Sequence, residues 1–137
     1  MIKLCYKEYS WKISNNACRS FKEKTGKDLN GVFADYIVAS INLDQNVSIF
    51  ERTEILRKLH SREDACKALH CIIEASQDGI SLEEIEDATY RVGWTLSDRP
   101  DELSEPWPVV MLDVAFQINS YLNDNLPAKK KADSKAD

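Results

Sequence analysis

The length and composition of the chain are those of one ordinary globular domain, with 137 residues, 43% hydrophobic, 30% charged, and only four Gly and four Pro. No apolar run approaches the ~20 residues of a membrane-crossing helix, and charges at Lys3, Lys7 and Glu8 interrupt any secretory signal. A net charge of −5 argues against a nucleic-acid-binding surface. We therefore expect a cytoplasmic domain whose partners are neither membranes nor nucleic acids.

The first predicted element is a β-hairpin over about residues 1–13. Large apolar residues alternate with polar or small ones on both sides of Lys7 and Glu8, namely Ile2, Leu4 and Tyr6, then Tyr9, Trp11 and Ile13. This period of two is typical of two short strands joined by a tight turn.

The pattern then changes to helical spacing. Ser14 or Asn15 is a suitable N-cap for a helix near residues 15–25, which Gly26 would end. Asp28 or Asn30 is a suitable cap for a second helix. The expected core face of this second helix comprises Val32, Phe33, Tyr36, Ile37, Ser40 and Ile41.

Three further helix starts are marked by a serine three residues before an acid, as in a capping box. The pairs are Ser48 with Glu51, Ser61 with Asp64, and Ser81 with Glu84. The apolar faces that follow are Ile49, Ile55, Leu56 and Leu59; then Ala65, Leu69, Ile72 and Ile73; then Leu82, Ile85, Ala88, Thr89 and Val92. Asp78-Gly79 and Gly93 are the expected ends of the last two helices.

Residues 94–108 contain three prolines and four acids, which exclude a continuous helix and predict a long loop. After Pro106 and Pro108 the last helix follows, with a face of Val110, Met111, Val114, Ala115, Ile118, Tyr121 and Leu122. Pro127 ends the ordered part, and residues 128–137 are Lys-rich and lack any large apolar residue. The sequence thus predicts a mainly α fold, a compact bundle of about five or six helices with a short N-terminal β-hairpin, as one domain over 1–127 with a disordered tail over 128–137.

Candidate catalytic and metal-binding residues are few. Cys66, His70 and Cys71 are the only group of zinc-ligand type, but their spacing is not that of a zinc site, so we interpret the cysteines as structural thiols. Cys66 and His70 share a helix face, yet nothing around them suggests a nucleophile pair. The adjacent acids Glu83, Glu84, Glu86 and Asp87 favour a solvated helix start over paired catalytic carboxylates. With no phosphate- or nucleotide-binding loop either, we predict a protein that is not an enzyme and has no cofactor or metal.

Trp94 and Trp107 flank the acidic, proline-rich loop. Such residues either close a hydrophobic core or anchor a protein interface. Core packing is the favoured structural interpretation, and partner binding by Trp94 and Trp107 is the functional hypothesis.

Several phrases of the sequence resemble tail assembly chaperones of long-tailed, siphovirus-type bacteriophages. They are the hairpin ending Tyr-Ser-Trp-Lys-Ile, the stretch Phe-Lys-Glu-Lys-Thr-Gly-Lys-Asp-Leu over residues 21–29, and Pro-Trp-Pro-Val-Val-Met-Leu-Asp at the last helix. A helical middle and a charged C-terminal tail complete the resemblance.

The resemblance implies a non-catalytic chaperone that binds the tape measure protein in the host cytoplasm and is not part of the mature virion. It also implies a longer product of a programmed ribosomal frameshift, which recruits the tail tube protein; codons for Ala128-Lys129-Lys130 are compatible with such a site. Two alternatives remain at this stage. One is an acidic regulatory or adaptor protein of phage or bacterial origin, suggested by the eight acids over residues 83–105, and the other is a small structural tail or head-completion protein.

Overall fold

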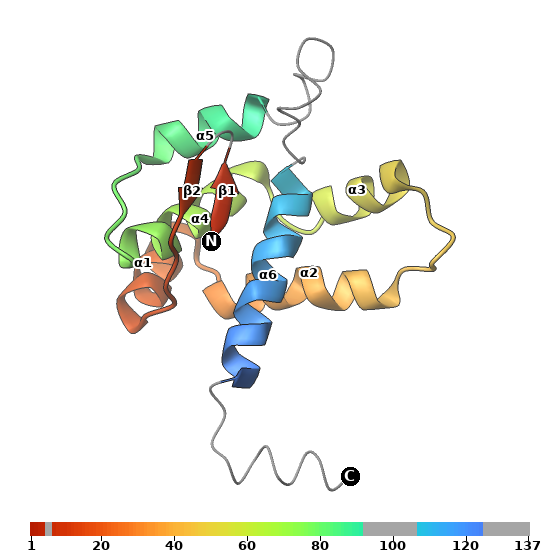
Figure 1. The fold of residues 1–137 in the computed structure, drawn as a ribbon, viewed down its shortest axis with the longest axis horizontal. Helices are drawn as coiled ribbons and strands as arrows, with labels where there is room; N and C mark the ends of the chain where they lie inside the picture. Colours follow the sequence, from red (N-terminus) through yellow and green to blue (C-terminus); the bar gives the residue numbers. More distant parts are fainter. Residues whose placement is uncertain (5–6, 92–106, 125–137) are drawn as a thin grey trace, which may run out of the picture.

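The computed structural model describes residues 1–4, 7–91 and 107–124, which form six helices and two short strands (Figure 1). In chain order these elements are β1 (Ile2–Leu4), β2 (Lys7–Tyr9), α1 (Asn15–Thr25), α2 (Leu29–Asn42), α3 (Ile49–Arg57), α4 (Arg62–Ala75), α5 (Leu82–Arg91) and α6 (Trp107–Asp124). The predicted mainly helical class is confirmed. The predicted loop before Trp107, the stop at Gly93, and the predicted tail lie outside the described residues.

The helix starts follow the serine and aspartate caps that the sequence predicts. Ser14 Oγ accepts a hydrogen bond from the Ala17 N–H at 3.0 Å, and Asp28 Oδ2 accepts one from the Gly31 N–H at 2.9 Å. The same bond recurs, at 3.1 to 3.2 Å, from Glu51 N–H to Ser48, Asp64 N–H to Ser61, and Glu84 N–H to Ser81. Each bond satisfies an N–H that has no partner inside its helix.

The cap of α2 gives a direct test of this local chemistry. We expect Asp28→Ala to lower the free energy of unfolding by about 1 kcal/mol, because the Gly31 N–H loses its acceptor. Asp28→Asn keeps a side-chain oxygen in place and should cost much less. Urea denaturation of both variants measures the difference, and equal losses would contradict a capping role.

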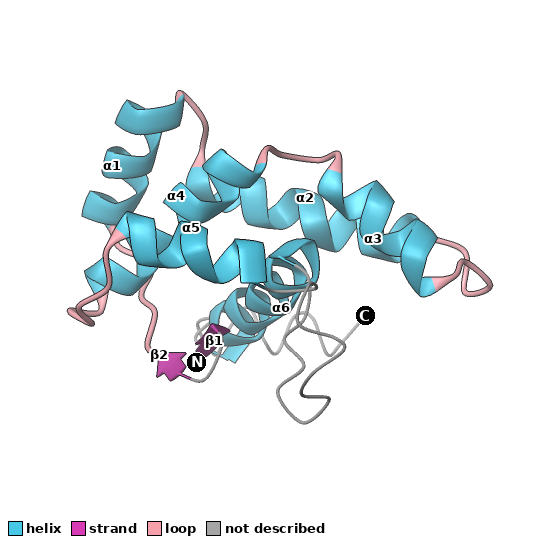
Figure 2. Cartoon of the chain, turned by 90° about the horizontal axis from the view of Figure 1, so that it is seen from above, coloured by secondary structure: helices cyan, strands magenta, loops and turns pink. Residues whose placement is uncertain are grey.

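The core is centred on α4, which contacts α1, α5 and α6, while α6 also packs against α2 and α3 (Figures 1 and 2). The largest fully buried side chains come from every helix and from β1: Tyr36, Phe21, Ile2, Leu29, Leu56, Leu69, Ile72, Ile73, Ile85, Met111, Val32 and Val114. α2 and α3 run side by side away from this centre, and both views place the loop over residues 43–48 at one end of the molecule.

The N-terminal segment differs from its prediction in extent. β1 and β2 pair antiparallel over three residues each, with Ile2 opposite Tyr9, but residues 10–13 are not in a strand. Their backbone bonds to α4 and to the loop after it: Lys12 N–H donates to the Ile72 carbonyl of α4 at 2.9 Å, and Ser10 N–H donates to Asp78 of the loop at 2.6 Å. The predicted hairpin over residues 1–13 is therefore wrong in its second half, because α4 and this loop satisfy the backbone that a strand partner was expected to satisfy.

The same segment is held to α6 by one glutamine. Trp11 Nε1–H donates to Gln117 Oε1 at 2.9 Å, and Gln117 Nε2–H donates to the Met1 carbonyl at 2.8 Å. The Trp11 ring meets the Tyr121 ring edge-on, with centroids 5.8 Å apart. Residues more than 100 positions apart are thereby joined.

α4 also ends earlier than predicted. Its C-cap is Ser76, and Gln77 takes the left-handed conformation with φ of 72°. The predicted stop at Asp78-Gly79 is wrong by two to three residues, since a non-glycine residue makes the turn. Gly26, by contrast, ends α1 with φ of 76°, as predicted.

Candidate protein-binding surface

Large apolar side chains lie in water at the end of the molecule where α2 meets α3. We call Val38, Ile41, Ile49, Phe50 and Ile55 the α2–α3 surface. Phe50 is 86% exposed, Ile49 80% and Ile41 73%. Together the five leave on the order of 500 Å² of apolar area exposed on two adjoining helices, and large exposed apolar area is often functional.

α2 is apolar on two opposite sides, which is unusual for a surface helix. Val32, Phe33 and Tyr36 face the core, whereas Ala34, Val38 and Ile41 are exposed. A helix at a protein surface normally turns charged residues outward. Asp35 is the only charged residue of α2, so the outward side of this helix is suited to contact with another molecule.

The exposure of these residues corrects the predicted core. The sequence placed Ile41, Ile49 and Ile55 on core faces, and the structure exposes all three. Tyr121 and Leu122 of α6, also predicted for the core, are 54% and 51% exposed. Helical periodicity identifies apolar positions, but only those that face a packed neighbour are covered, and for α2 and α3 that neighbour is mainly α6.

The rim of the α2–α3 surface is acidic. Asp35, Asp44 and Glu51 lie within or beside the surface and are exposed, and residues 28–51 contain no Lys or Arg. The next base is Arg52 on α3, which is partly buried, and Arg57 pairs with Glu54 at 3.2 Å. We did not predict the outward apolar side of α2 or its acidic rim from the sequence, although residues 28–51 contain no Lys or Arg.

A cluster of charged and polar side chains fixes α2 against the turn between α3 and α4. Lys27 Nζ lies 2.7 Å from Asp64 Oδ2 and 3.2 Å from His60 Nδ1, and His60 Nε2 lies 2.8 Å from Asp35 Oδ2. Because the lysine ammonium can only donate, Nδ1 accepts and the Nε2–H donates to Asp35. This cluster, which the sequence did not predict, holds the two helices of the surface in place.

Of the two tryptophans predicted to bind a partner, Trp107 is in the core and Trp94 lies outside the described residues. Trp107 begins α6 and is 6% exposed, with the guanidinium carbon of Arg57 5.9 Å from its ring centroid. Its surroundings favour the core-packing interpretation, since a side chain this buried presents little area to a partner.

Cys66, His70 and Cys71, the three residues considered as zinc ligands, do not form a metal-binding cluster in the described structure. Cys66 and Cys71 are buried, and His70 Nδ1 lies 3.7 Å from Glu74 Oε2. Within the described residues no three His, Cys, Asp or Glu side chains meet to hold a metal ion. Of the four acids of α5 expected on a solvated helix start, Glu83, Glu84 and Asp87 are exposed and Glu86 is partly buried.

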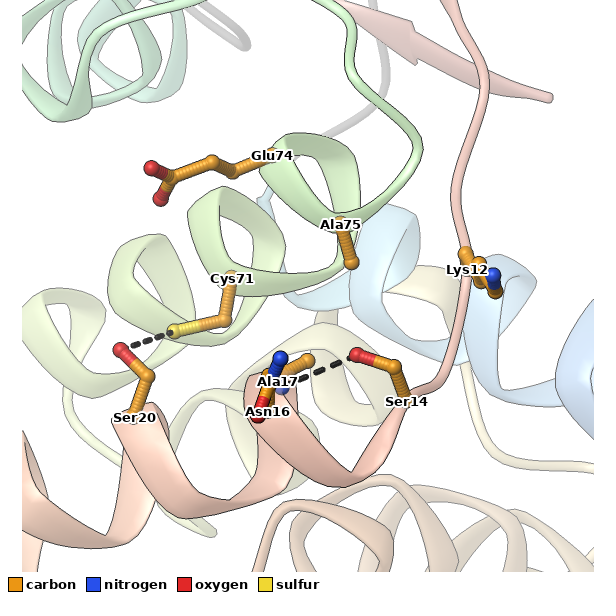
Figure 3. A pocket seen from close by; sticks show the side chains of 8 residues that line it. All are labelled: Lys12, Ser14, Asn16, Ala17, Ser20, Cys71, Glu74 and Ala75. Carbon is orange, nitrogen blue, oxygen red and sulfur yellow. Dashed lines mark hydrogen bonds between the residues drawn. The ribbon is translucent and has the colours of Figure 1, made fainter.

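A shallow cleft of about 400 Å³ lies between α1 and α4 (Figure 3). Cys71 lines it and is 3.9 Å from the Ser20 hydroxyl. Burial raises the pKa of the Cys71 thiol, and burial followed by the Asp28 carboxylate raises the pKa of Cys18. Both thiols therefore stay protonated at neutral pH, which makes them poor nucleophiles. The cleft offers no activated group for covalent chemistry.

Two observations complete the comparison of sites. No helix among the described residues is long and apolar enough to cross a membrane. Among the described residues, the α2–α3 surface carries the most exposed large apolar side chains, with Ile41, Ile49 and Phe50 the most exposed of its five residues. In comparisons with known proteins, no protein-family model, no curated protein and no solved structure matches the chain.

Proposed function

We propose that this protein is a phage tail assembly chaperone that binds the tape measure protein and keeps it soluble before tail assembly. The observation that carries the proposal is the apolar α2–α3 surface, with Ile41, Ile49 and Phe50 each more than 70% exposed. The resemblance of residues 21–29 to this family supplies the partner. A long helical protein exposes apolar stripes before assembly, and an apolar helix surface can cover them.

The size of the surface fits reversible binding. About 500 Å² on one partner is less than the ~800 Å² that each partner buries in a standard stable interface. The α2–α3 surface alone is therefore of a size typical of a transient complex. A chaperone needs this property, because it must release the tape measure protein when tube subunits arrive.

The test is co-expression with the tape measure protein of the same genome. We expect the unmodified chain to raise the soluble fraction of that protein severalfold, and Phe50→Ser to abolish most of the effect. Phe116→Ser is the matched control, since Phe116 is a half-exposed phenylalanine on α6. Circular dichroism must show that both variants fold.

The proposal fails if the unmodified chain neither binds nor solubilises the tape measure protein. An adaptor function would then be preferred, because Glu83, Glu84 and Asp87 of α5 offer an exposed acidic surface to a basic partner. As part of the proposed function we place the protein in the host cytoplasm, with a longer frameshift product recruiting the tail tube protein. Presence of the chain in purified virions would instead favour a structural tail or head-completion protein.

A further inference from the structure

We propose that the α2–α3 surface takes an amphipathic helix whose apolar stripe is bordered by lysine or arginine, and that it does not take a second copy of this chain. The inference rests on the proposed function, because it names the chemistry that the client must present to this surface. Two observations carry it: the spacing of the exposed apolar residues on α2, and the charge around them.

The spacing matches that of a helix-packing ridge. Ala34, Val38 and Ile41 are exposed at positions i, i+4 and i+7 of α2. Residues four apart, such as Ala34 and Val38, and three apart, such as Val38 and Ile41, form the side-chain ridges against which a second helix packs. Ile49 and Phe50 begin α3, which packs against α2, and add exposed apolar area next to this helix. An extended peptide would find no free strand edge here, because the described surface is helical.

The charge selects a basic partner. Asp35, Asp44 and Glu51 are exposed beside or between the apolar residues, and together with Glu54 these four acids outnumber the two bases of α3, Arg52 and Arg57. Asp35 remains 56% exposed at its side chain even though it accepts from His60. Lysine or arginine along the borders of an incoming apolar stripe would meet these acids, which favours the encounter and fixes its orientation.

The same acids disfavour a second copy. In a two-fold symmetric dimer the same surface meets itself, with residue i of one copy against residue j of the other. Because acids outnumber bases on this surface, most of the charges brought together would be alike, which is destabilising. The apolar area would favour self-association, but its acidic rim makes a basic helix the better occupant.

The experiment uses the full chain and two fluorescein-labelled peptides of about 18 residues, long enough to form a helix on binding. Both carry leucines at helical i, i+3, i+4 and i+7 spacing; one has lysines at the remaining positions and the other has glutamates. We expect the lysine peptide to bind at least ~10-fold more tightly in fluorescence anisotropy. Raising the ionic strength from about 0.05 M to about 0.5 M should narrow that difference, because exposed charges are screened.

Variants of the chain separate the apolar contact from the charge. Phe50→Ala should weaken binding of the lysine peptide about 10- to 100-fold, whereas the matched control Phe116→Ala should change it by less than about 2-fold. The double variant Asp44→Asn, Glu51→Gln should weaken it about 3- to 10-fold through the loss of two rim charges. Asparagine at position 44 keeps the oxygen that accepts from the Asn46 N–H at 3.0 Å, so the loop is preserved.

The outcomes distinguish this inference from the proposed function. Equal binding of the two peptides, with Phe50 still required, would overturn the charge preference and leave the apolar chaperone surface standing. Binding of neither peptide, or binding unaffected by Phe50→Ala, would overturn the surface itself, while solubilisation of the tape measure protein would still be decided by co-expression. If sedimentation analysis shows a stable dimer, and Phe50→Ala dissociates it, then a second copy of the chain occupies the surface.

Discussion

Replacing Trp107 with alanine is expected to lower the free energy of unfolding by about 3–5 kcal/mol. The indole is 6% exposed at the start of α6, and the Arg57 guanidinium lies over its ring at 5.9 Å. Its removal would leave a cavity where α6 meets α3 and would also end a cation–π contact worth about 0.5–1 kcal/mol. Urea denaturation followed by circular dichroism measures the loss.

Phe116→Ala on the same helix is the control for this variant. Phe116 is 44% exposed, so its truncation should cost less than about 1 kcal/mol. If Trp107→Ala instead keeps normal stability but no longer solubilises the tape measure protein, Trp107 is a partner-binding residue and its assignment to the core is wrong.

Tyr36→Ala is expected to cost a similar 3–5 kcal/mol, whereas Tyr36→Phe should be neutral or stabilise by up to about 1 kcal/mol. The Tyr36 side chain is fully buried between α2 and the rest of the core, and its ring centroid lies 5.9 Å from that of His60. Its hydroxyl has no hydrogen-bond partner among the described residues. Most of the stabilisation therefore comes from the ring, and the buried hydroxyl contributes a cost.

Tyr36 should also affect how the stability of the chain depends on pH. Burial, reinforced by the carboxylates of Asp35 and Asp64, raises the pKa of Tyr36. The folded chain then keeps a proton that the unfolded chain releases above about pH 10, so this residue makes stability fall as pH rises past that value. Tyr36→Phe should remove this part of the alkaline destabilisation. If the unmodified chain and the Tyr36→Phe variant lose stability with the same slope at alkaline pH, the buried placement of the hydroxyl is contradicted.

The helix starts were predictable because their chemistry is local. Ser14, Ser48 and Ser61 each bond to an N–H three residues on, and a four-residue window of sequence contains both partners. Gly26 ends α1 for a similarly local reason, since glycine adopts positive φ without steric cost. Six helices therefore follow from caps, period and breakers.

The ends of helices and strands that depend on residues far away in the sequence could not be predicted from local sequence. Tyr9, Trp11 and Ile13 alternate as a strand does, but Trp11 bonds to Gln117 and the neighbouring backbone bonds to α4. Nothing within residues 1–13 records those contacts. The left-handed turn at Gln77 is equally invisible, because a glycine two residues later is the more favourable position for it.

The candidate binding surface escaped prediction for a related reason. Their spacing placed Ile41, Ile49 and Ile55 on core faces, but Ile41 lies on the outward side of α2, opposite Tyr36. Whether another element covers that side depends on tertiary arrangement, and α2 and α3 project beyond the helices that would cover it. An apolar stripe without cover is a property of the whole fold, and a sequence window does not contain it.

The packing of α6 against α2 also has a consequence for the order in which the chain matures on the ribosome. The core side of α2 is complete at Tyr36, but Ile118, the last buried residue of α6, is synthesised about 80 residues later. At ~5–20 residues per second this interval lasts on the order of 4–16 s. Throughout it the part of α2 that packs against α6 lacks its cover, and Gln117 is not yet present to hold Trp11. The nascent chain thus passes through a period in which it needs the same protection from aggregation that the mature protein is proposed to give its client.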